Sequence, residues 1–207
     1  MKTSMKLARL FCAALLVAAA TAALSAQVGK SQGVADINSM SEANVAALPG
    51  LNATIAKALV AKRPFASITD LNAFLLAQGL TQEQASAVYA KAFVQINLNT
   101  ATEPEILLVP GAGRRMVREF DEYRPWKTYA QFDKEIGKYV GPEGAAKLAQ
   151  FTFIPMNANT AADADLLTVP GADQAWVEKV KKGRPYKTAA DLEKVAGKAQ
   201  ARFFVIE

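Results

Sequence analysis

Apolar residues recur three positions apart in three short segments, and each segment ends at a Pro-Gly pair. The apolar pairs are Val45 and Leu48, Ile106 and Val109, and Leu166 and Val169. A spacing of three places both members of a pair on one face of a helix. The pattern therefore predicts three short helices, which end at Pro49-Gly50, Pro110-Gly111 and Pro170-Gly171, because glycine readily adopts the left-handed conformation that ends a helix.

The Pro-Gly pairs belong to an internal repeat. Pro110 lies 61 residues after Pro49 and 60 residues before Pro170. A second signature recurs with the same spacing, namely Arg63-Pro64-Phe65, Arg124-Pro125-Trp126 and Arg184-Pro185-Tyr186. Proline disfavours the helical conformation of the residue before it, so a second helix should end here, with the aromatic ring turned onto the core. Self-similarity at a fixed period predicts three tandem units.

Helix-start signals divide each unit further. An asparagine is followed by a hydroxyl residue and, three positions later, by an acid: Asn38-Ser39 with Glu42, Asn99-Thr100 with Glu103, and Asn159-Thr160 with Asp163. This is the spacing of a capping box, although Ser41 and Thr102 compete as caps. A third helix should open at a second set of caps and be anchored by an apolar residue: Ser67, Asp70 and Leu71; Thr128, Gln131 and Phe132; Thr188, Asp191 and Leu192.

A fourth helix is predicted over roughly residues 82–93 and 143–151, and a truncated or frayed one over 199–207. The fold expected from these patterns is all-α, with three units of about four short helices each. The units would span residues 27–95, 96–154 and 155–207, the last being shortened.

The first 26 residues have the pattern of an export signal. Lys2, Lys6 and Arg9 precede an apolar run over residues 10–20, and small residues follow through Ala26. Cleavage is expected near Ala26, with cuts after Ala23 or Ser25 as alternatives. An uncleaved anchor is less favoured, because the run is short for a membrane span and rich in alanine. We expect a periplasmic or secreted protein with no stable membrane insertion after cleavage.

Composition narrows the chemistry of the exported part. Removing residues 1–26 leaves 21 basic against 19 acidic residues, a net charge of +2, so steering of nucleic acid by global charge is weak. The chain has no histidine, and its one cysteine, Cys12, lies in the signal. Disulfides, structural zinc, imidazole bases and cysteine nucleophiles are therefore not expected. No catalytic constellation is found, and we expect neither an enzyme nor a bound metal or cofactor.

The strongest candidate site is the turn Gly111-Ala112-Gly113, which runs into a basic helix. Gly111 and Gly113 permit positive φ angles, and a new helix should begin near Arg114. The first amides of a helix have no internal partner and carry partial positive charge, so a phosphate can approach them. Arg114, Arg115 and Arg118 would lie in or just beyond the first turn.

This stretch resembles the helix-hairpin-helix motif, an apolar residue followed by Pro-Gly-x-Gly. Residues 96–103, followed by 109–113, resemble specifically the ComEA-type family of exported competence proteins. The resemblance implies a tandem helix-hairpin-helix fold and non-specific contact with the backbone of double-stranded DNA, received during natural transformation. Members of that family usually carry one such domain, so three copies are a departure.

The other two hairpins are weaker candidates. The second glycine is replaced by Asn52 in the first unit, which also offers Gly50 and Lys57. Asp173 replaces it in the third unit, where Gly171 and Lys179 are the related positions. Asparagine can cap a helix, but the carboxylate of Asp173 would occupy and repel the site where a phosphate should sit.

A second interpretation keeps the fold without the nucleic acid. The Pro-Gly turns would then only stop one helix and start the next, and the partner would be another periplasmic protein, as in the extrinsic photosystem protein family. The run Lys179, Lys181, Lys182, Arg184 and Lys187 is interpreted as a solvated helix face because acidic residues surround it. Trp126 and Trp176 are expected in the core, since the repeat places apolar residues at their positions.

Overall fold

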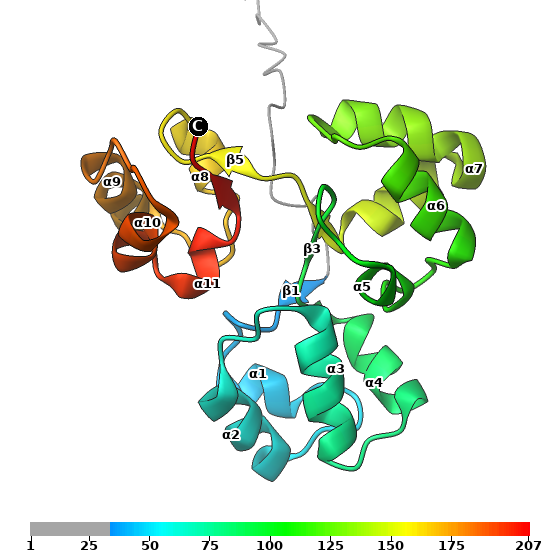
Figure 1. The fold of residues 1–207 in the computed structure, drawn as a ribbon. Coiled ribbons are helices and arrows are strands. Elements are labelled where there is room, and N and C mark those ends of the chain that lie inside the picture. The colour runs from blue at the N-terminus through cyan, green and yellow to red at the C-terminus, as the bar shows by residue number, and fades with distance from the viewer. Residues whose placement is uncertain (1–33) are drawn as a thin grey trace, which may run out of the picture.

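The computed structural model describes residues 34–207; the predicted signal, residues 1–26, lies outside them. Helices dominate this part of the chain, in three lobes that surround a central junction (Figure 1). The first lobe contains β1 Ala35–Asp36, α1 Glu42–Ala46, α2 Ala53–Lys62, α3 Ile68–Ala77, α4 Gln82–Tyr89 and β2 Ala92–Phe93. The second contains β3 Ile96–Asn97, α5 Glu103–Leu107, α6 Arg114–Glu122, α7 Tyr129–Ala149 and β4 Thr152–Phe153. The third contains β5 Met156–Asn157, α8 Asp163–Leu166, α9 Gln174–Lys182, α10 Ala189–Ala196, α11 Lys198–Ala201 and β6 Phe204–Val205.

The expectation of an all-α fold is wrong in one respect. Each lobe begins and ends with a two-residue strand, and the two strands pair in parallel, as β1 with β2, β3 with β4, and β5 with β6. Such strands are too short to show an alternating pattern, so the sequence did not predict that they pair. The helix predicted over residues 82–93 accordingly ends at Tyr89. The last segment, predicted as a truncated or frayed helix, is the short helix α11 followed by β6.

Two sharp glycine turns recur in every lobe. Glycines with positive φ lie between the first two helices of each lobe, at Gly50, Gly111 and Gly171. A second set lies before the last helical segment, at Gly79, Gly141 and Gly197. At Gly141, with φ 71° and ψ 170°, α7 is kinked into two helical parts, which correspond to the predicted third and fourth helices of that unit. Each lobe is thus a pair of helical hairpins.

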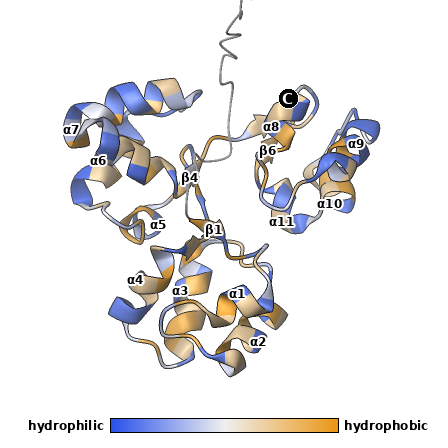
Figure 2. Cartoon of the chain, turned by 180° about the vertical axis from the view of Figure 1, so that it is seen from behind, coloured by the Kyte–Doolittle hydropathy of each residue, from blue (hydrophilic) through white to orange (hydrophobic). Residues whose placement is uncertain are grey.

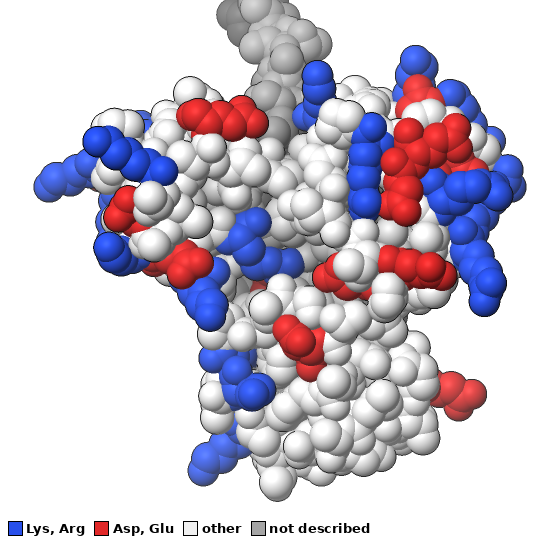
Figure 3. Space-filling model, viewed as in Figure 1, with Lys and Arg blue, Asp and Glu red and all other residues white. Residues whose placement is uncertain are grey.

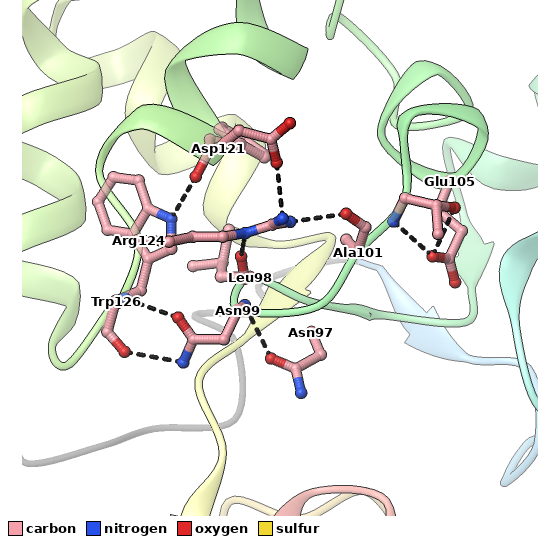
Figure 4. Close-up of polar contacts among 10 residues, drawn as sticks. Asn97, Leu98, Asn99, Ala101, Glu105, Asp121, Arg124 and Trp126 are labelled. Carbon is pink, nitrogen blue, oxygen red and sulfur yellow. Dashed lines mark hydrogen bonds and ion pairs between the residues drawn. The ribbon is translucent and has the colours of Figure 1, made fainter.

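The repeated asparagine and the repeated aromatic residue bind each other. The side-chain amide of Asn99 donates to the carbonyl of Trp126 over 3.0 Å, and its oxygen accepts from the Trp126 backbone N–H over 2.6 Å (Figure 4). The same two-bond contact joins Asn38 with Phe65, and Asn159 with Tyr186. This contact ties the start of each lobe to the segment that follows its second helix. Phe65, Trp126 and Tyr186 are buried, as predicted.

The arginine of each Arg-Pro-aromatic signature also faces the protein. Nε of Arg124 donates to the carbonyl of Leu98 over 2.8 Å, and Nη2 donates to that of Ala101 over 2.6 Å (Figure 4). Arg184 makes the equivalent bonds to Ala158 and Ala161, and Arg63 donates to the carbonyl of Met40. These arginines hold the loop ahead of each first helix.

The predicted caps divide into two groups. Ser67, Thr128 and Thr188 cap the third helices as expected, each accepting from a backbone N–H three residues on. Of the alternatives for the first helices, Ser41 and Thr102 are the caps, and Ser39 and Thr100 are not. In the third lobe the cap expected at Thr160 is wrong, because the helix begins after Ala162. The backbone N–H groups of Ser39, Thr100 and Thr160 instead close turns onto Asp36, Asn97 and Asn157.

Burial follows the predicted apolar faces. The three apolar pairs and the anchors Leu71, Phe132 and Leu192 are all buried. Buried residues of the first two lobes form one continuous cluster, in which Phe93 packs edge-on against Phe151 with ring centroids 5.1 Å apart, whereas the third lobe has a separate cluster. Hydrophilic ribbon is concentrated on α6, α7 and α9 (Figure 2).

Candidate nucleic-acid interface

The predicted turn joins α5 to α6 in the second lobe. The backbone N–H of Ala112 donates to the carbonyl of Val109 over 2.9 Å, and Gly111 has φ 85°, as predicted. Gly113 differs from the prediction, since its φ of −119° and ψ of −173° are extended and open to any residue. The backbone conformation therefore does not require a glycine here, and what distinguishes Gly113 is the absence of a side chain.

Gly113 is the N-cap of α6 and supplies no capping side chain. Its carbonyl accepts from the N–H of Met116 over 2.8 Å. The N–H groups of Arg114 and Arg115 have no acceptor among residues 34–207. A Cβ built on Gly113 would meet no atom within 4 Å, so the space in front of these amides is open. The start of α6 therefore presents unpartnered donors and the positive end of the helix dipole.

The three arginines of α6 lie at the surface. The side chain of Arg115 is 59% exposed and that of Arg118 is 69% exposed. Arg114 is exposed as well and makes no ion pair with any residue in the range 34–207. The structure therefore brings all of the predicted residues of this hairpin together at one end of the second lobe.

One acidic residue of this helix, Glu119, modifies the basic cluster and was not anticipated from sequence. Its side chain is only 2% exposed, and its Oε1 lies 3.1 Å from Nη2 of Arg118 and 3.9 Å from Nε of Arg115. Burial raises the pKa of Glu119, but the hydrogen bonds from Arg118 and Tyr139 and the charge of Arg115 outweigh it and leave the pKa below its usual value. Glu119 thus remains ionised and partly neutralises the cluster.

Two tyrosines complete the surroundings of the arginines. The guanidinium carbon of Arg115 lies 4.6 Å from the ring centroid of Tyr139. The hydroxyls of Tyr139 and Tyr123 lie 3.0 Å apart and share a hydrogen bond, which raises the pKa of Tyr139. A guanidinium over an aromatic face is attracted by the ring quadrupole, so this contact stabilises the Arg115 side chain beside Tyr139. On the face of the α5–α7 lobe seen in Figure 3, Lys and Arg side chains adjoin Asp and Glu side chains.

The turn also borders a groove shared with the first lobe. The groove has a volume of about 410 Å³ and is lined by residues 107–112 together with Gln82 and Ser86 of α4. A chain of phosphates lying along the turn would therefore also meet these two polar side chains. Neither was singled out by the sequence, because the contact arises only from the packing of two lobes.

In the hairpin of the first lobe, the start of the second helix is capped by a side chain. The side-chain oxygen of Asn52 accepts from the N–H of Ile55 over 2.9 Å, as predicted for a capping asparagine. Gly50 has φ 73°, and Lys57 is exposed one turn further along α2. One of the helix-start amides is thus already bound, and the hairpin offers a single nearby base.

The hairpin of the third lobe is closed in two ways. Oδ1 of Asp173 accepts from the N–H of Trp176 over 2.7 Å. A Cβ on Gly171 would lie 3.7 Å from Cβ of Ser39 in the first lobe, so this turn packs within the molecule. Lys179 is exposed.

The basic run of the third lobe is tied to the protein at two points. Nζ of Lys181 lies 2.7 Å from Oδ1 of Asp163, and Arg184 is bound to backbone carbonyls as described above.

The two tryptophans differ in burial. Trp126 is 1% exposed, as expected for a core residue. Trp176 is half-buried, and its indole N–H donates to the carbonyl of Ala196.

Comparisons with known proteins give no match to a family model, to a curated protein or to a solved structure. Within residues 34–207 no helix has the length and apolar character needed to cross a membrane. The same part of the chain contains no group of three or more acidic, histidine or cysteine side chains arranged to hold a metal ion.

Proposed function

We propose that this chain is an exported, non-enzymatic protein that binds double-stranded DNA through phosphate contacts at the turn Gly111-Ala112-Gly113 and the start of α6. We also propose that its three lobes are tandem helix-hairpin-helix units. The observation that carries the proposal is the uncapped start of α6, where two unpartnered N–H groups lie beside Arg114, Arg115 and Arg118.

The physical basis is the fit between these donors and a phosphodiester. Oriented N–H groups at a helix start bind an anionic oxygen at close range, and the arginines reach the neighbouring phosphates. Such contacts position a duplex but carry no base information. Binding should therefore be independent of sequence and modest in strength, with a dissociation constant of roughly 10⁻⁴ to 10⁻⁶ M at physiological salt.

The other hairpins support this assignment by contrast. Asn52 and Asp173 each occupy a helix-start amide with their own side chains, and Asp173 adds a negative charge. DNA contact is accordingly assigned to the second lobe. An export signal over residues 1–26 would bring the protein to a compartment where incoming DNA is met.

A second candidate function is a protein-interaction scaffold. It is favoured by the packing of the Gly171 turn beside Ser39, which shows that this kind of turn also serves as a packing element. The ion pair between Glu119 and Arg118 also favours the scaffold, because it reduces the positive charge available to bind phosphate.

Fluorescence anisotropy of two labelled duplexes of equal length and unrelated sequence decides between these candidates. The purified protein is titrated into each duplex at low ionic strength. The DNA proposal expects saturable binding with dissociation constants that agree within about threefold, since phosphate contacts are shared by all sequences. An absence of binding to both duplexes would leave the scaffold as the function of the fold.

A further inference from the structure

A cavity of about 340 Å³ lies between the first and third lobes, away from the proposed DNA site. Most of its walls are apolar, and they are formed by Pro64, Phe65, Phe204 and the alanines at 66, 189, 199 and 201. Lys198 and Arg202 are the basic residues of the wall, and Glu193 is the acidic one. Lys and Arg side chains are visible in the recess between these two lobes (Figure 3).

Arg202 is held rigidly at this cavity. Its side chain is 18% exposed, and its Nη2 donates to the carbonyl of Gln95, in the connector between the first two lobes. The guanidinium carbon lies 5.3 Å from the ring centroid of Phe153 and 5.0 Å from that of Phe203. Contacts with these groups fix the guanidinium in place before any ligand arrives, which lowers the entropic cost of binding one.

The charge of Arg202 is incompletely balanced. Its Nη1 lies 3.9 Å from Oδ2 of Asp36, too far for a hydrogen bond, and this buried nitrogen has no hydrogen-bond partner. Arg63 interacts with the same carboxylate, and its Nε and Nη2 are also buried without partners. Two guanidinium groups therefore share one buried carboxylate, and three of their nitrogens lack an acceptor. Arg202 lines the cavity and Arg63 does not, so the excess positive charge of this pair reaches the cavity through Arg202 and would favour an anion there.

We propose that this cavity binds a small organic monocarboxylate with an apolar body. The carboxylate would accept from Arg202 and Lys198, and the hydrocarbon part would lie against Phe65, Phe204 and the alanines. The wall carries two bases and one acid, Glu193, which suits a single negative charge. Because the cavity is lined by two lobes, the ligand would also join the first lobe to the third. This site is independent of the DNA site.

Calorimetric titration of the purified protein with benzoate and with hexanoate tests the site. Saturable binding of at least one carboxylate is expected. The neutral isosteres benzamide and hexanamide should bind at least about tenfold more weakly, because a charge-assisted hydrogen bond is worth at least about 1.5 kcal/mol. Inorganic phosphate, which has no apolar part to fill the cavity, should also bind more weakly than the carboxylates.

Variants separate the cavity from the surface. Arg202 contributes to the junction of the lobes, so the variants avoid it. Ala201→Phe should fill the cavity and abolish carboxylate binding, and Lys198→Met should weaken it about tenfold. Lys187→Met, which removes an exposed base outside the cavity, should leave binding unchanged. The proposal is overturned if neither carboxylate binds, if the amides bind equally well, or if Ala201→Phe in a folded protein leaves binding intact.

Discussion

Gly113 differs from the matching residues of the other two hairpins in leaving the start of the following helix uncapped. At the matching position Asn52 and Asp173 cap their helices with their own side chains, whereas Gly113 leaves the helix start open. The open space was predictable from the sequence, since only glycine lacks a Cβ. The positive φ suggested for Gly113 was wrong, because its backbone is extended and does not need a glycine.

Replacing Gly113 with aspartate should abolish DNA binding and preserve the fold. A Cβ at this position meets no atom of the protein, and the new carboxylate would cap the helix and repel phosphate. Duplex anisotropy and a thermal melt measure the two effects. Gly137→Asp is the matched control, because a Cβ there also meets nothing and the added charge is the same. Equal binding by wild type and Gly113→Asp would remove the turn from the DNA site.

Glu119 should weaken the attraction between the arginines of α6 and DNA. Glu119→Gln removes the carboxylate that pairs with Arg118 and Arg115, so affinity for duplex DNA should rise and its salt dependence should steepen. The pKa of Glu119 is lowered in the folded protein, so its stabilising effect is present above the usual glutamate pKa of 4.5 and is lost as the pH falls through the lower folded value.

Urea unfolding of wild type and Glu119→Gln over acidic pH measures this second effect. The free energy of unfolding of the wild type should fall more steeply below pH 4.5 than that of the variant. Parallel curves, together with unchanged DNA affinity, would show that Glu119 does not govern the arginines. Sequence alone did not reveal this role, because an acid one residue from an arginine is normally a solvated charge and its burial depends on packing against α7.

At the scale of the helices, local signals were the most predictable part of the fold. Caps at Ser67, Thr128 and Thr188, the apolar pairs and the buried aromatics follow from chemistry within a few residues. The sequence left two possible starts for the first helices, because each asparagine-hydroxyl pair has the spacing of a cap but closes a turn in the structure. Strand pairs were missed because they join residues 48 to 57 positions apart in the chain.

Loss of a cap tests this local account. Ser67→Ala and Thr128→Ala should each lower the free energy of unfolding by about 1 kcal/mol, because each removes an acceptor for a helix-start N–H. Ser86→Ala is the control: its hydroxyl lies within α4 and donates to the carbonyl of Gln82, so little stability should be lost. The assigned caps would be contradicted if Ser67→Ala and Thr128→Ala had the same urea midpoint as the wild type and Ser86→Ala.

At the scale of the whole molecule, the arrangement of the three lobes could not be predicted from the sequence. Two-residue connectors, at residues 94–95 and 154–155, leave little freedom between neighbouring lobes. Arg202, near the end of the third lobe, reaches Asp36 in the first and the carbonyl of Gln95. Nothing near Arg202 in the chain marks it as a junction residue. The same packing places Gln82 and Ser86 beside the Gly111 turn and Ser39 beside the Gly171 turn.

A salt titration of duplex binding tests the DNA proposal most directly. If phosphates are bound through the three arginines of α6, about three counterions are released, and the log-log slope of affinity against salt should be roughly −3. Arg114→Ala combined with Arg115→Ala should flatten that slope by about two. Lys181→Ala combined with Lys182→Ala, in α9, removes the same charge and should leave the slope unchanged. An absence of salt-dependent binding by the wild type at low ionic strength would contradict the account.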